Sequence, residues 1–331
     1  MAEVSYPHTN RRLRTDRHIR ELTSTVRLSH KSFIQPLFVE ESVSEKRLVS
    51  GLNDVWVDTS ISIIQTIEQD LAAGISKFLL FPIPEHKTSS GFDFGFASGV
   101  ISMIKEKFGD RVWIAADLCL CSYTNHGHCG MLNDAQTRLL NHETVLELAA
   151  YALSLAKSGA DCIAPSDMTD GRIGAIRTTL DQHGSDHVSI MSYAAKFSSQ
   201  FYGPFRDACH SSPNSIGLQN RKSYQISPFN LKDAIDTALR DETEGADVLM
   251  VKPAGNYTDV IKGIAELSNK PIAAYHVSGE YAALELLVKE GLADRQAVHL
   301  EVWAALARAG ATIIISYASR HAKQWIENAA L

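Results

Sequence analysis

The sequence lacks several features that would place it in common protein classes. Its 331 residues include only five cysteines. No apolar run approaches the roughly 20 residues that a membrane-spanning helix needs. The opening stretch, MAEVSYPHTN, has no apolar core of the kind found in a secretory signal. The formal net charge of −6 does not suit a nucleic-acid-binding surface, which is usually basic. We therefore expect a soluble, cytoplasmic protein that binds neither membranes nor nucleic acid.

One local bias departs from this acidic balance. Several arginines crowd the start of the chain: Arg11, Arg12, Arg14, Arg17 and Arg20. Such a cluster could bind nucleic acid or act as an organellar address. Because Asp16 and Glu21 interrupt the charge, we favour an arm that packs on an acidic neighbouring subunit. Residues 1–32 are therefore expected to form an N-terminal arm ahead of the folded domain.

A pattern of helix, glycine and strand recurs along the chain. In each copy an amphipathic run passes through one glycine into a short apolar segment, at Gly74, Gly159, Gly245 and Gly310. Glycine is favoured where a helix ends on a left-handed residue. The segments are apolar throughout rather than alternating, which indicates strands with both faces buried. Such strands are typical of a parallel sheet flanked by helices.

The whole chain contains eight predicted strands of this kind. Four end the glycine-containing segments 72–81, 157–165, 243–251 and 308–316, and four lie at 33–39, 111–117, 187–192 and 271–277. Helical patterns lie near 59–73, 93–108, 142–158, 170–183, 230–244, 257–268, 279–290 and 318–329, with an additional one near 293–309.

This alternation predicts a (β/α)8 TIM barrel over residues 33–331. A doubly wound open sheet is the alternative fold. It is weakened because no G-x-G-x-x-G motif follows a predicted strand. No linker rich in glycine, proline or serine divides the chain.

Polar and reactive side chains follow the predicted strands. In a barrel of this type the active site lies at the C-terminal ends of the strands. The residues at or just beyond these ends include Asp117, Ser166, Lys196, Lys252, Ser278 and Tyr317. The sequence therefore predicts an active site at one mouth of the barrel.

Lys252 is the most informative of these residues. Four apolar residues, VLMV, precede it and Pro253 follows it. Burial and a nearby cation such as Lys196 would lower the pKa of its amine, and a free amine can attack a ketone to form a Schiff base. The alternative is an ordinary lysine whose ammonium reaches solvent. Two lysines at one mouth could lower each other's pKa or serve two carbonyl substrates.

Three of the five cysteines lie close together in the stretch DLCLCSYTNHGHCG, at Cys119, Cys121 and Cys129. A reducing compartment argues against a disulfide and leaves a metal site or reduced thiols as the alternatives. His126 or His128 could complete a closed, four-coordinate structural site. The position after the third strand instead favours three thiolates and an open fourth position, where Zn²⁺ would act as a Lewis acid.

A long segment bearing glycine, serine and proline follows the fifth strand. Long loops in a compact barrel often act as lids. Arg206 and Arg221 within this segment could clamp a carboxylate through paired N–H groups. Solvated surface arginines are the alternative, and the spacing alone favours them.

Several long motifs resemble those of the porphobilinogen synthase (5-aminolevulinate dehydratase) family. The similarity runs in order from about residue 11 to about residue 317, through DLCLCSYTNHGHCG, GADCIAPSDMTDGRIGAIR, SYAAKFSSQFYGPFRDA, RKSYQ, ADVLMVKPAGNY and YHVSGEY. The resemblance implies a (β/α)8 barrel whose N-terminal arm wraps a neighbouring subunit, usually in a homo-octamer. It also implies a hydro-lyase that condenses two 5-aminolevulinate molecules to porphobilinogen, with loss of two waters, in tetrapyrrole (haem) biosynthesis.

The resemblance also implies roles for individual residues. Lys252 would form the Schiff base with the substrate that contributes the propionate side, and Lys196 would serve the second substrate. The three cysteines match the ligands of the zinc-dependent members, whereas other members have an Asp-rich sequence there and use other metals. The carboxylate-binding residues would be Ser278 and Tyr317 for the first substrate and Arg206, Arg221 and Gln225 for the second, with Asp117 and Ser166 lining the pocket. Asp233 lies about where some members bind an activating Mg²⁺ at a subunit interface.

The chain departs from the family pattern at a few positions. Thr169 stands where a second Met is usual, Asn220 replaces the Asp before Arg221, and His276 stands where Gln is common. Residues 48–54 lack the usual Met-Pro-Gly. None of these changes removes a lysine or a cysteine, so we expect activity to be kept, while the behaviour of the lid could differ.

Two other functions are weighed against this one. A Schiff-base aldolase is also a barrel with a lysine at a strand end, but it needs one lysine and no cysteine cluster. A structural or storage zinc protein that has lost catalysis would bind zinc tightly and form no imine with any keto acid.

Overall fold

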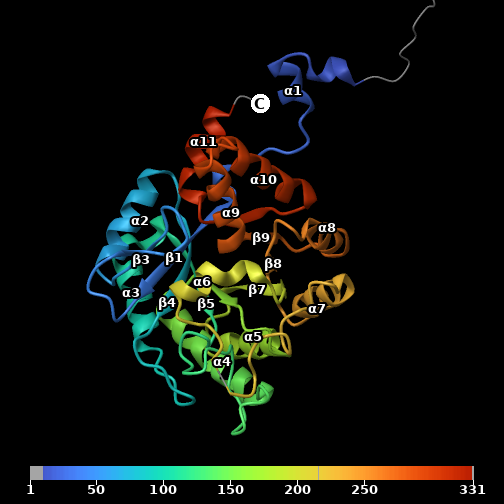
Figure 1. Cartoon of the computed structure of the whole chain (residues 1–331). Helices are drawn as coiled ribbons and strands as arrows, with labels where there is room; N and C mark the ends of the chain where they lie inside the picture. Colours follow the sequence, from blue (N-terminus) through green and yellow to red (C-terminus); the bar gives the residue numbers. More distant parts are fainter. Residues whose placement is uncertain (1–9, 215, 330–331) are drawn as a thin grey trace, which may run out of the picture.

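The computed structural model describes residues 10–214 and 216–329. Within these residues, eight parallel strands close into a barrel (Figure 1). The strands are β1 (Phe33–Glu40), β4 (Lys77–Ile83), β5 (Trp113–Leu118), β6 (Cys162–Pro165), β7 (Ser189–Lys196), β8 (Val248–Lys252), β9 (Ile272–His276) and β10 (Ile313–Ser316). Each pairs with the next, and β1 pairs with β10 with Phe33 opposite Ile314, which closes the ring. The predicted (β/α)8 barrel is confirmed.

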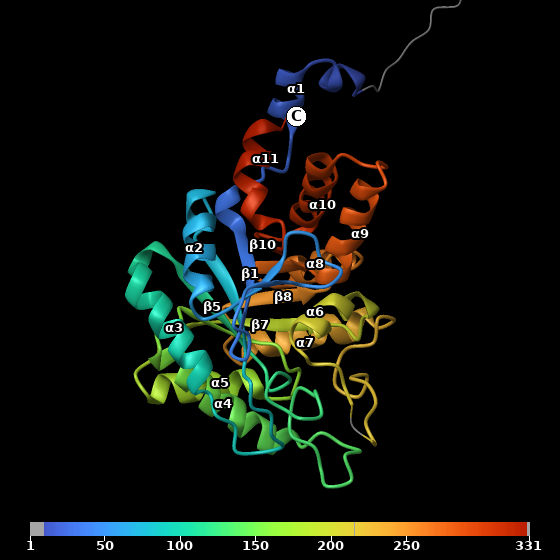
Figure 2. The ribbon, with the colours of Figure 1, turned by 60° about the vertical axis from the view of Figure 1, so that its left-hand side comes forward.

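Helices surround the barrel on its outer side (Figure 2). They are α2 (Ser62–Ala72), α3 (Gly95–Phe108), α4 (Asn141–Lys157), α5 (Arg172–Gln182), α7 (Leu231–Thr243), α8 (Thr258–Leu267), α9 (Ser278–Lys289), α10 (Arg295–Ala309) and α11 (Ala322–Asn328). Each lies within a few residues of a helical pattern in the sequence. Among the residues that the structure describes, no helix is long and apolar enough to cross a membrane.

The recurring glycines end helices as the pattern predicts. Gly74, Gly159, Gly245 and Gly310 follow α2, α4, α7 and α10, and each has a positive φ. Gly310 shows the constraint most directly. Its φ is 121°, and a Cβ at this position would lie 2.6 Å from the Cβ of Ala265. A left-handed backbone and close contact with α8 both require glycine here.

The structure contains short elements that the sequence did not predict. Strands β2 (Arg47–Leu48) and β3 (Trp56–Asp58) form a hairpin, in which β3 extends the sheet beside β1. Helix α6 (Gly203–Ala208) lies in the long segment between β7 and α7 (197–230), called the lid segment below. These elements are too short to show a hydrophobic period. The strand predicted at 187–192 was drawn too short, since β7 continues to Lys196 through an irregularity between Ser192 and Ala195.

The N-terminal arm projects away from the barrel in both views (Figures 1 and 2). Its described part contains the 3-10 turn Arg11–Arg14 and α1 (Arg17–Thr23), and neither buries a residue. Asp16 caps α1 by accepting a hydrogen bond from the backbone N–H of Ile19. Residues 1–9 of the predicted arm lie outside the described residues, and the domain boundary at residue 32 stays a prediction.

Candidate functional site

Lys196 and Lys252 end neighbouring strands at the mouth of the barrel. Lys196 is the last residue of β7, Lys252 is the last residue of β8, and the two are paired in the strand register. Both side chains are buried, and Lys252 is only 3% exposed. The structure therefore excludes the alternative in which the ammonium of Lys252 reaches solvent. The register itself brings two amines to one level of the barrel.

Aromatic rings enclose the amine of Lys252. Its Nζ lies 4.2 Å from the ring centre of Tyr275, 4.7 Å from that of Phe205 and 4.9 Å from that of Tyr193. Phe205 belongs to α6, so the lid segment packs over the amine of Lys252. Burial lowers the pKa of Lys252 to about 7, and the charge of Lys196 contributes to the shift. A large fraction of this amine is therefore free near neutral pH.

Asp117 and Ser166 lie beside the second lysine. The Nζ of Lys196 donates to the backbone carbonyl of Ser166, which follows β6. Asp117 is near the end of β5, and its Oδ1 is buried without a hydrogen-bond partner. Burial raises the pKa of Asp117, while the two lysine charges act in the opposite direction. A buried, unpaired carboxyl oxygen beside two amines is suited to bind or transfer a proton.

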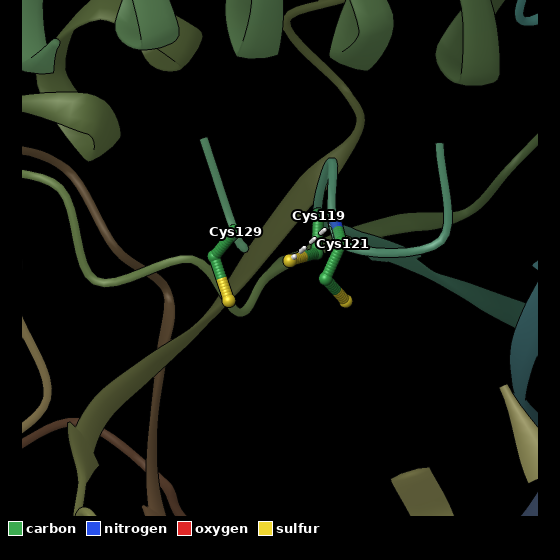
Figure 3. Close-up of side chains that lie close together, drawn as sticks. All are labelled: Cys119, Cys121 and Cys129. Carbon is green, nitrogen blue, oxygen red and sulfur yellow. Dashed lines mark hydrogen bonds between the residues drawn. The ribbon is translucent and has the colours of Figure 1, made fainter. Parts of the chain in front are cut away.

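The three clustered cysteines meet on the loop after β5 (Figure 3). The sulfur atoms of Cys119, Cys121 and Cys129 all lie within 4.8 Å of one another, and every one of these side chains is buried. They are free thiols, so the disulfide reading of this stretch is excluded in the structure. Hydrogen bonds from the other two thiols lower the pKa of Cys129, whereas burial raises the pKa of Cys119.

This donor set fits a metal ion. Three sulfurs converging from one loop form the soft, negatively charged set that zinc prefers when they are deprotonated. No histidine belongs to the group among the described residues. His128 instead contacts the hydroxyl of Tyr224 and the carbonyl of Leu218, while His126 accepts from the backbone N–H of His128. The hydrogen bonds of the two histidines lie within the loop and to Tyr224 and Leu218, so neither ring is grouped with the three sulfur atoms.

The lid segment carries polar side chains that are buried and incompletely satisfied. Both amide atoms of Gln225 lack a partner, as do the Nε atoms of Arg206 and Arg221. Buried polar groups are almost always hydrogen-bonded, so groups left unpaired indicate a place for a polar ligand. Burial and the neighbouring Arg221 both lower the pKa of Arg206. Each of the three predicted lid residues thus keeps at least one unpaired polar atom, although Nη2 of Arg206 and of Arg221 donates to backbone carbonyls.

Ser278 and Tyr317 contact the groups that surround Lys252. Ser278 begins α9, and its Oγ accepts from the backbone N–H of Phe205 at 3.2 Å and donates to the carbonyl of Phe201 at 3.3 Å. The hydroxyls of Tyr317 and Tyr275 lie 3.2 Å apart. These two predicted substrate-binding residues therefore lie on the Lys252 side of the mouth.

Asp233 is not among the residues that surround the two lysines or the cysteine cluster. It lies in the first turn of α7, is exposed, and accepts a long hydrogen bond of 3.5 Å from Thr237. Together with Asp170, Arg240 and the lid residue Gln225 it lines a cavity of about 490 Å³. In the described part of the chain no set of three close metal ligands includes Asp233.

Sequence reasoning missed the aromatic residues around the lysines. Tyr193 lies three residues before Lys196 and Tyr275 lies on β9, so both were near predicted site residues. Regular alternation would place Tyr193 and Lys196 on opposite faces of their strand, so the sequence does not predict that the two side chains lie close together. Phe205 reaches Lys252 only through the fold of the lid.

The chain is similar to known proteins over nearly its whole length. A family model for delta-aminolevulinic acid dehydratase matches residues 8–325. The enzyme of that name from Bacillus subtilis is 40% identical over 321 residues, covering 96% of this chain and 97% of that protein. The one from Helicobacter pylori (strain J99) is 43% identical over 319 residues, covering 95% and 96%.

A solved structure is similar over nearly the whole chain. It is the crystal structure of delta-aminolevulinic acid dehydratase (porphobilinogen synthase) from Toxoplasma gondii ME49, in complex with the reaction product porphobilinogen. It matches with a TM-score of 0.92 at 36% identity and covers 97% of this chain and 92% of that one. The chain belongs to the delta-aminolevulinic acid dehydratase family.

Proposed function

We propose that the protein is a porphobilinogen synthase, which condenses two molecules of 5-aminolevulinate into porphobilinogen and releases two waters in tetrapyrrole biosynthesis. The observation that carries this proposal is the register pairing of Lys196 and Lys252 at a mouth that also holds three convergent thiols. A Schiff-base aldolase would need only one of these lysines and none of the cysteines. Membership of the family supports the same conclusion.

Lys252 is the proposed nucleophile toward the first substrate. Its free amine adds to the ketone carbon, and the carbonyl oxygen leaves as water when the imine forms. The imine makes the neighbouring carbon acidic, so a proton can be removed there. Asp117, whose raised pKa follows from burial, has a carboxyl oxygen free to take up or return such a proton.

The carboxylates of the two substrates are proposed to bind on opposite sides of the mouth. Ser278 and Tyr317 lie on the Lys252 side, whereas Arg206, Arg221 and Gln225 lie in the lid. Arginine binds carboxylate through two parallel N–H groups, which fixes orientation as well as position. Holding both substrates in this way converts an encounter of two molecules into an oriented reaction within one site.

Cys119, Cys121 and Cys129 are the residues that would hold zinc. Bound there, the ion would supply a Lewis acid able to coordinate the carbonyl or amine of the second substrate. Lys196, whose amine already contacts the carbonyl of Ser166, would orient or activate the same substrate. The donor set of three thiols supports zinc, whose fourth position is proposed to be open to the substrate.

Trapping with borohydride tests the proposed function. Labelled 5-aminolevulinate, pyruvate and a sugar phosphate are each incubated with the enzyme and reduced, and the labelled peptide is mapped. We expect 5-aminolevulinate to label Lys252 and porphobilinogen to form in the assay. Lys252→Ala should abolish both, while Lys262→Ala, an exposed lysine on α8 paired with Glu266, should change neither. Labelling by pyruvate alone would establish the aldolase instead.

We also propose a homo-oligomeric assembly, a cytoplasmic location and a second metal. The projecting arm supports a homo-oligomer, because neither its 3-10 turn Arg11–Arg14 nor α1 buries a residue, and the family resemblance points to an octamer. Light scattering on the purified protein would measure its mass.

A cytoplasmic location is tested by cell fractionation. An activating Mg²⁺ at Asp233 would need ligands from water or another subunit, and Asp233→Asn should remove any activation by Mg²⁺.

A further inference from the structure

Two residues of β7 face the interior of the barrel although their spacing forbids it in a regular strand. The Nζ of Lys196 lies 5.4 Å from the ring centre of Tyr193, and that ring also lies 4.9 Å from the Nζ of Lys252. Side chains three residues apart on a regular strand point to opposite faces. Something in β7 must therefore change the alternation between Tyr193 and Lys196.

A one-residue bulge makes this change. Ser192 pairs with Leu249, whereas Ala195 pairs with Val251, so β7 advances three residues while β8 advances two. A bulge inserts one residue on one strand and reverses the direction of the side chains beyond it. Continued from Ser192 without the bulge, the register would place Lys196 opposite Pro253 with its side chain turned out of the barrel. The pairing of Lys196 with Lys252 depends on this irregularity.

A buried guanidinium contacts the bulge from the outer side of the strand. Arg172, the first residue of α5, is fully buried. Its Nη2 donates to the Oγ of Ser192 at 3.2 Å and to the carbonyl of Tyr193 at 3.4 Å. Nη2 also donates to Asp241 on α7 at 3.0 Å, and the hydroxyl of Ser192 donates to the same carboxylate oxygen. The bulge is thus held between α5 and α7.

The same guanidinium also contacts the turn that accepts the amine of Lys196. The Nε of Arg172 lies 3.4 Å from Asp167, and Nη1 donates to the carbonyl of Thr169 at 3.3 Å. Asp167 directly follows Ser166, whose carbonyl accepts from Lys196. One side chain therefore fixes both the strand that carries Lys196 and the turn against which its amine rests.

Thr169 adds a contact that the usual family residue could not make. Both its backbone N–H and its hydroxyl donate to the Oδ1 of Asp167. Burial raises the pKa of Asp167, whereas the charge of Arg172 and the hydrogen bonds from Thr169 act in the opposite direction. A methionine at position 169 would remove the hydroxyl donor.

We propose that Arg172, held by Asp167 and Asp241, is a positioning residue that maintains the bulge in β7 and thereby directs Lys196 toward Lys252. Arginine suits this role because its fixed fork of five N–H donors can satisfy several acceptors in one plane. The inference rests on the proposed function, since it assigns Lys196 a part in turnover. Arg172 itself contacts neither lysine in the contacts described above and would act through the backbone of β7 and the Ser166 turn.

The test compares variants of the bulge with a matched control on the same strand. Ser192→Ala removes one contact of the guanidinium, Arg172→Lys keeps the charge but loses the fork, and Ser189→Ala removes a hydroxyl that donates to Asp161 at the start of β7. Lys196→Ala serves as the reference for loss of the second amine. For each protein the turnover of 5-aminolevulinate, the borohydride labelling of Lys252 and the melting temperature are measured.

We expect the bulge variants to resemble Lys196→Ala. Labelling of Lys252 should be kept, while kcat should fall roughly 100-fold for Arg172→Lys and about tenfold for Ser192→Ala, because displacements near 1 Å have effects of this size. Ser189→Ala should keep wild-type turnover. A purely structural role predicts loss of labelling and turnover together, and that result, or unchanged kcat in Ser192→Ala, would overturn the inference.

The two proposals fail separately in this experiment. If the wild-type protein labels no lysine with 5-aminolevulinate and forms no porphobilinogen, the proposed function is wrong. If the wild type does both and the bulge variants turn over normally, only the role of Arg172 is wrong. Should Arg172→Lys not fold, Ser192→Ala alone decides the outcome.

Discussion

Arg221 donates a hydrogen bond of 2.9 Å to the carbonyl of Gly127, two residues before Cys129. The same nitrogen donates to the carbonyl of Ser211 at 2.6 Å, in the segment that follows α6. Burial would lower the pKa of Arg221, but the neighbouring cysteines raise it above its usual value. The residue that the resemblance assigned to a substrate carboxylate thus also joins the lid to the cysteine loop.

Replacing Arg221 should therefore affect both metal and substrate. In Arg221→Met we expect zinc to be lost to a chelator at lower concentration, and KM for 5-aminolevulinate to rise by roughly tenfold or more, the size of a lost hydrogen bond to a charged group. Zinc content after chelator titration and initial rates measure the two effects. Arg206 makes no described contact with the cysteine loop, so Arg206→Met should raise KM and leave zinc retention unchanged. Equal zinc retention in the two variants would contradict this link.

The pH dependence of imine formation should follow Lys252. Its pKa of about 7 lies below the ordinary value of 10.5, and only the unprotonated amine attacks the ketone. The rate of borohydride trapping with 5-aminolevulinate should therefore fall about tenfold per pH unit below pH 7 and level off above it. Between pH 7 and 10.5 the unfolded chain binds more protons at this group, so its contribution makes the folded state more stable as pH rises.

A variant at the second lysine checks the cause of that shift. Lys196→Met removes a cation that lowers the pKa of Lys252, so the acid limb of trapping should move to higher pH. Because burial is the larger cause, the limb should still lie well below 10.5. A limb that stays in place would show that the charge of Lys196 does not act on Lys252.

Replacing a cysteine of the cluster should affect zinc binding and turnover, whereas replacing another buried cysteine should not. Cys129→Ala should lose bound zinc and porphobilinogen formation together, because two sulfurs leave the ion short of protein ligands. Cys162→Ala is the matched control, since Cys162 is equally buried on β6 but lies outside the cluster. It should keep zinc and turnover, apart from a modest loss of stability through the cavity. Metal analysis and activity, with and without added zinc, measure the result.

Gln225 should show opposite effects on stability and on binding. Both of its amide atoms are buried without a partner, so Gln225→Met removes unpaired polar atoms at similar volume. We expect the melting temperature of the free enzyme to stay level or rise, while KM for 5-aminolevulinate rises about tenfold because a ligand contact is lost. A fall in melting temperature with KM unchanged would assign Gln225 a structural role instead.

Most of the barrel could be predicted from the sequence because its signals are local. The glycines at 74 and 310 end helices, and the strands that follow are apolar throughout because both of their faces are buried. The hairpin at β2 and β3 escaped prediction, since strands of two or three residues show no period. The end of β7 was misplaced because a bulge interrupts the alternation that strand prediction depends on.

The residues of the candidate site were predictable, whereas their surroundings were not. Lys252 and the cysteines stand out by residue type and by their place after a strand. The ring of Phe205 over Lys252 and the guanidinium of Arg172 behind Lys196 depend on contacts between segments far apart in the chain. Arg221 shows the same limit, because its contact with Gly127 is set by the path of two loops.

The closure of the barrel by β1 and β10 has a consequence for engineering. Phe33 starts β1 opposite Ile314, near the start of β10, so the chain enters its first strand beside the point where it enters its last. In both views α1 and α11 lie at the same end of the molecule (Figures 1 and 2). Every segment that forms the catalytic mouth is then internal to the chain. Fusion partners or affinity tags joined at either end should leave that mouth unobstructed within the same subunit.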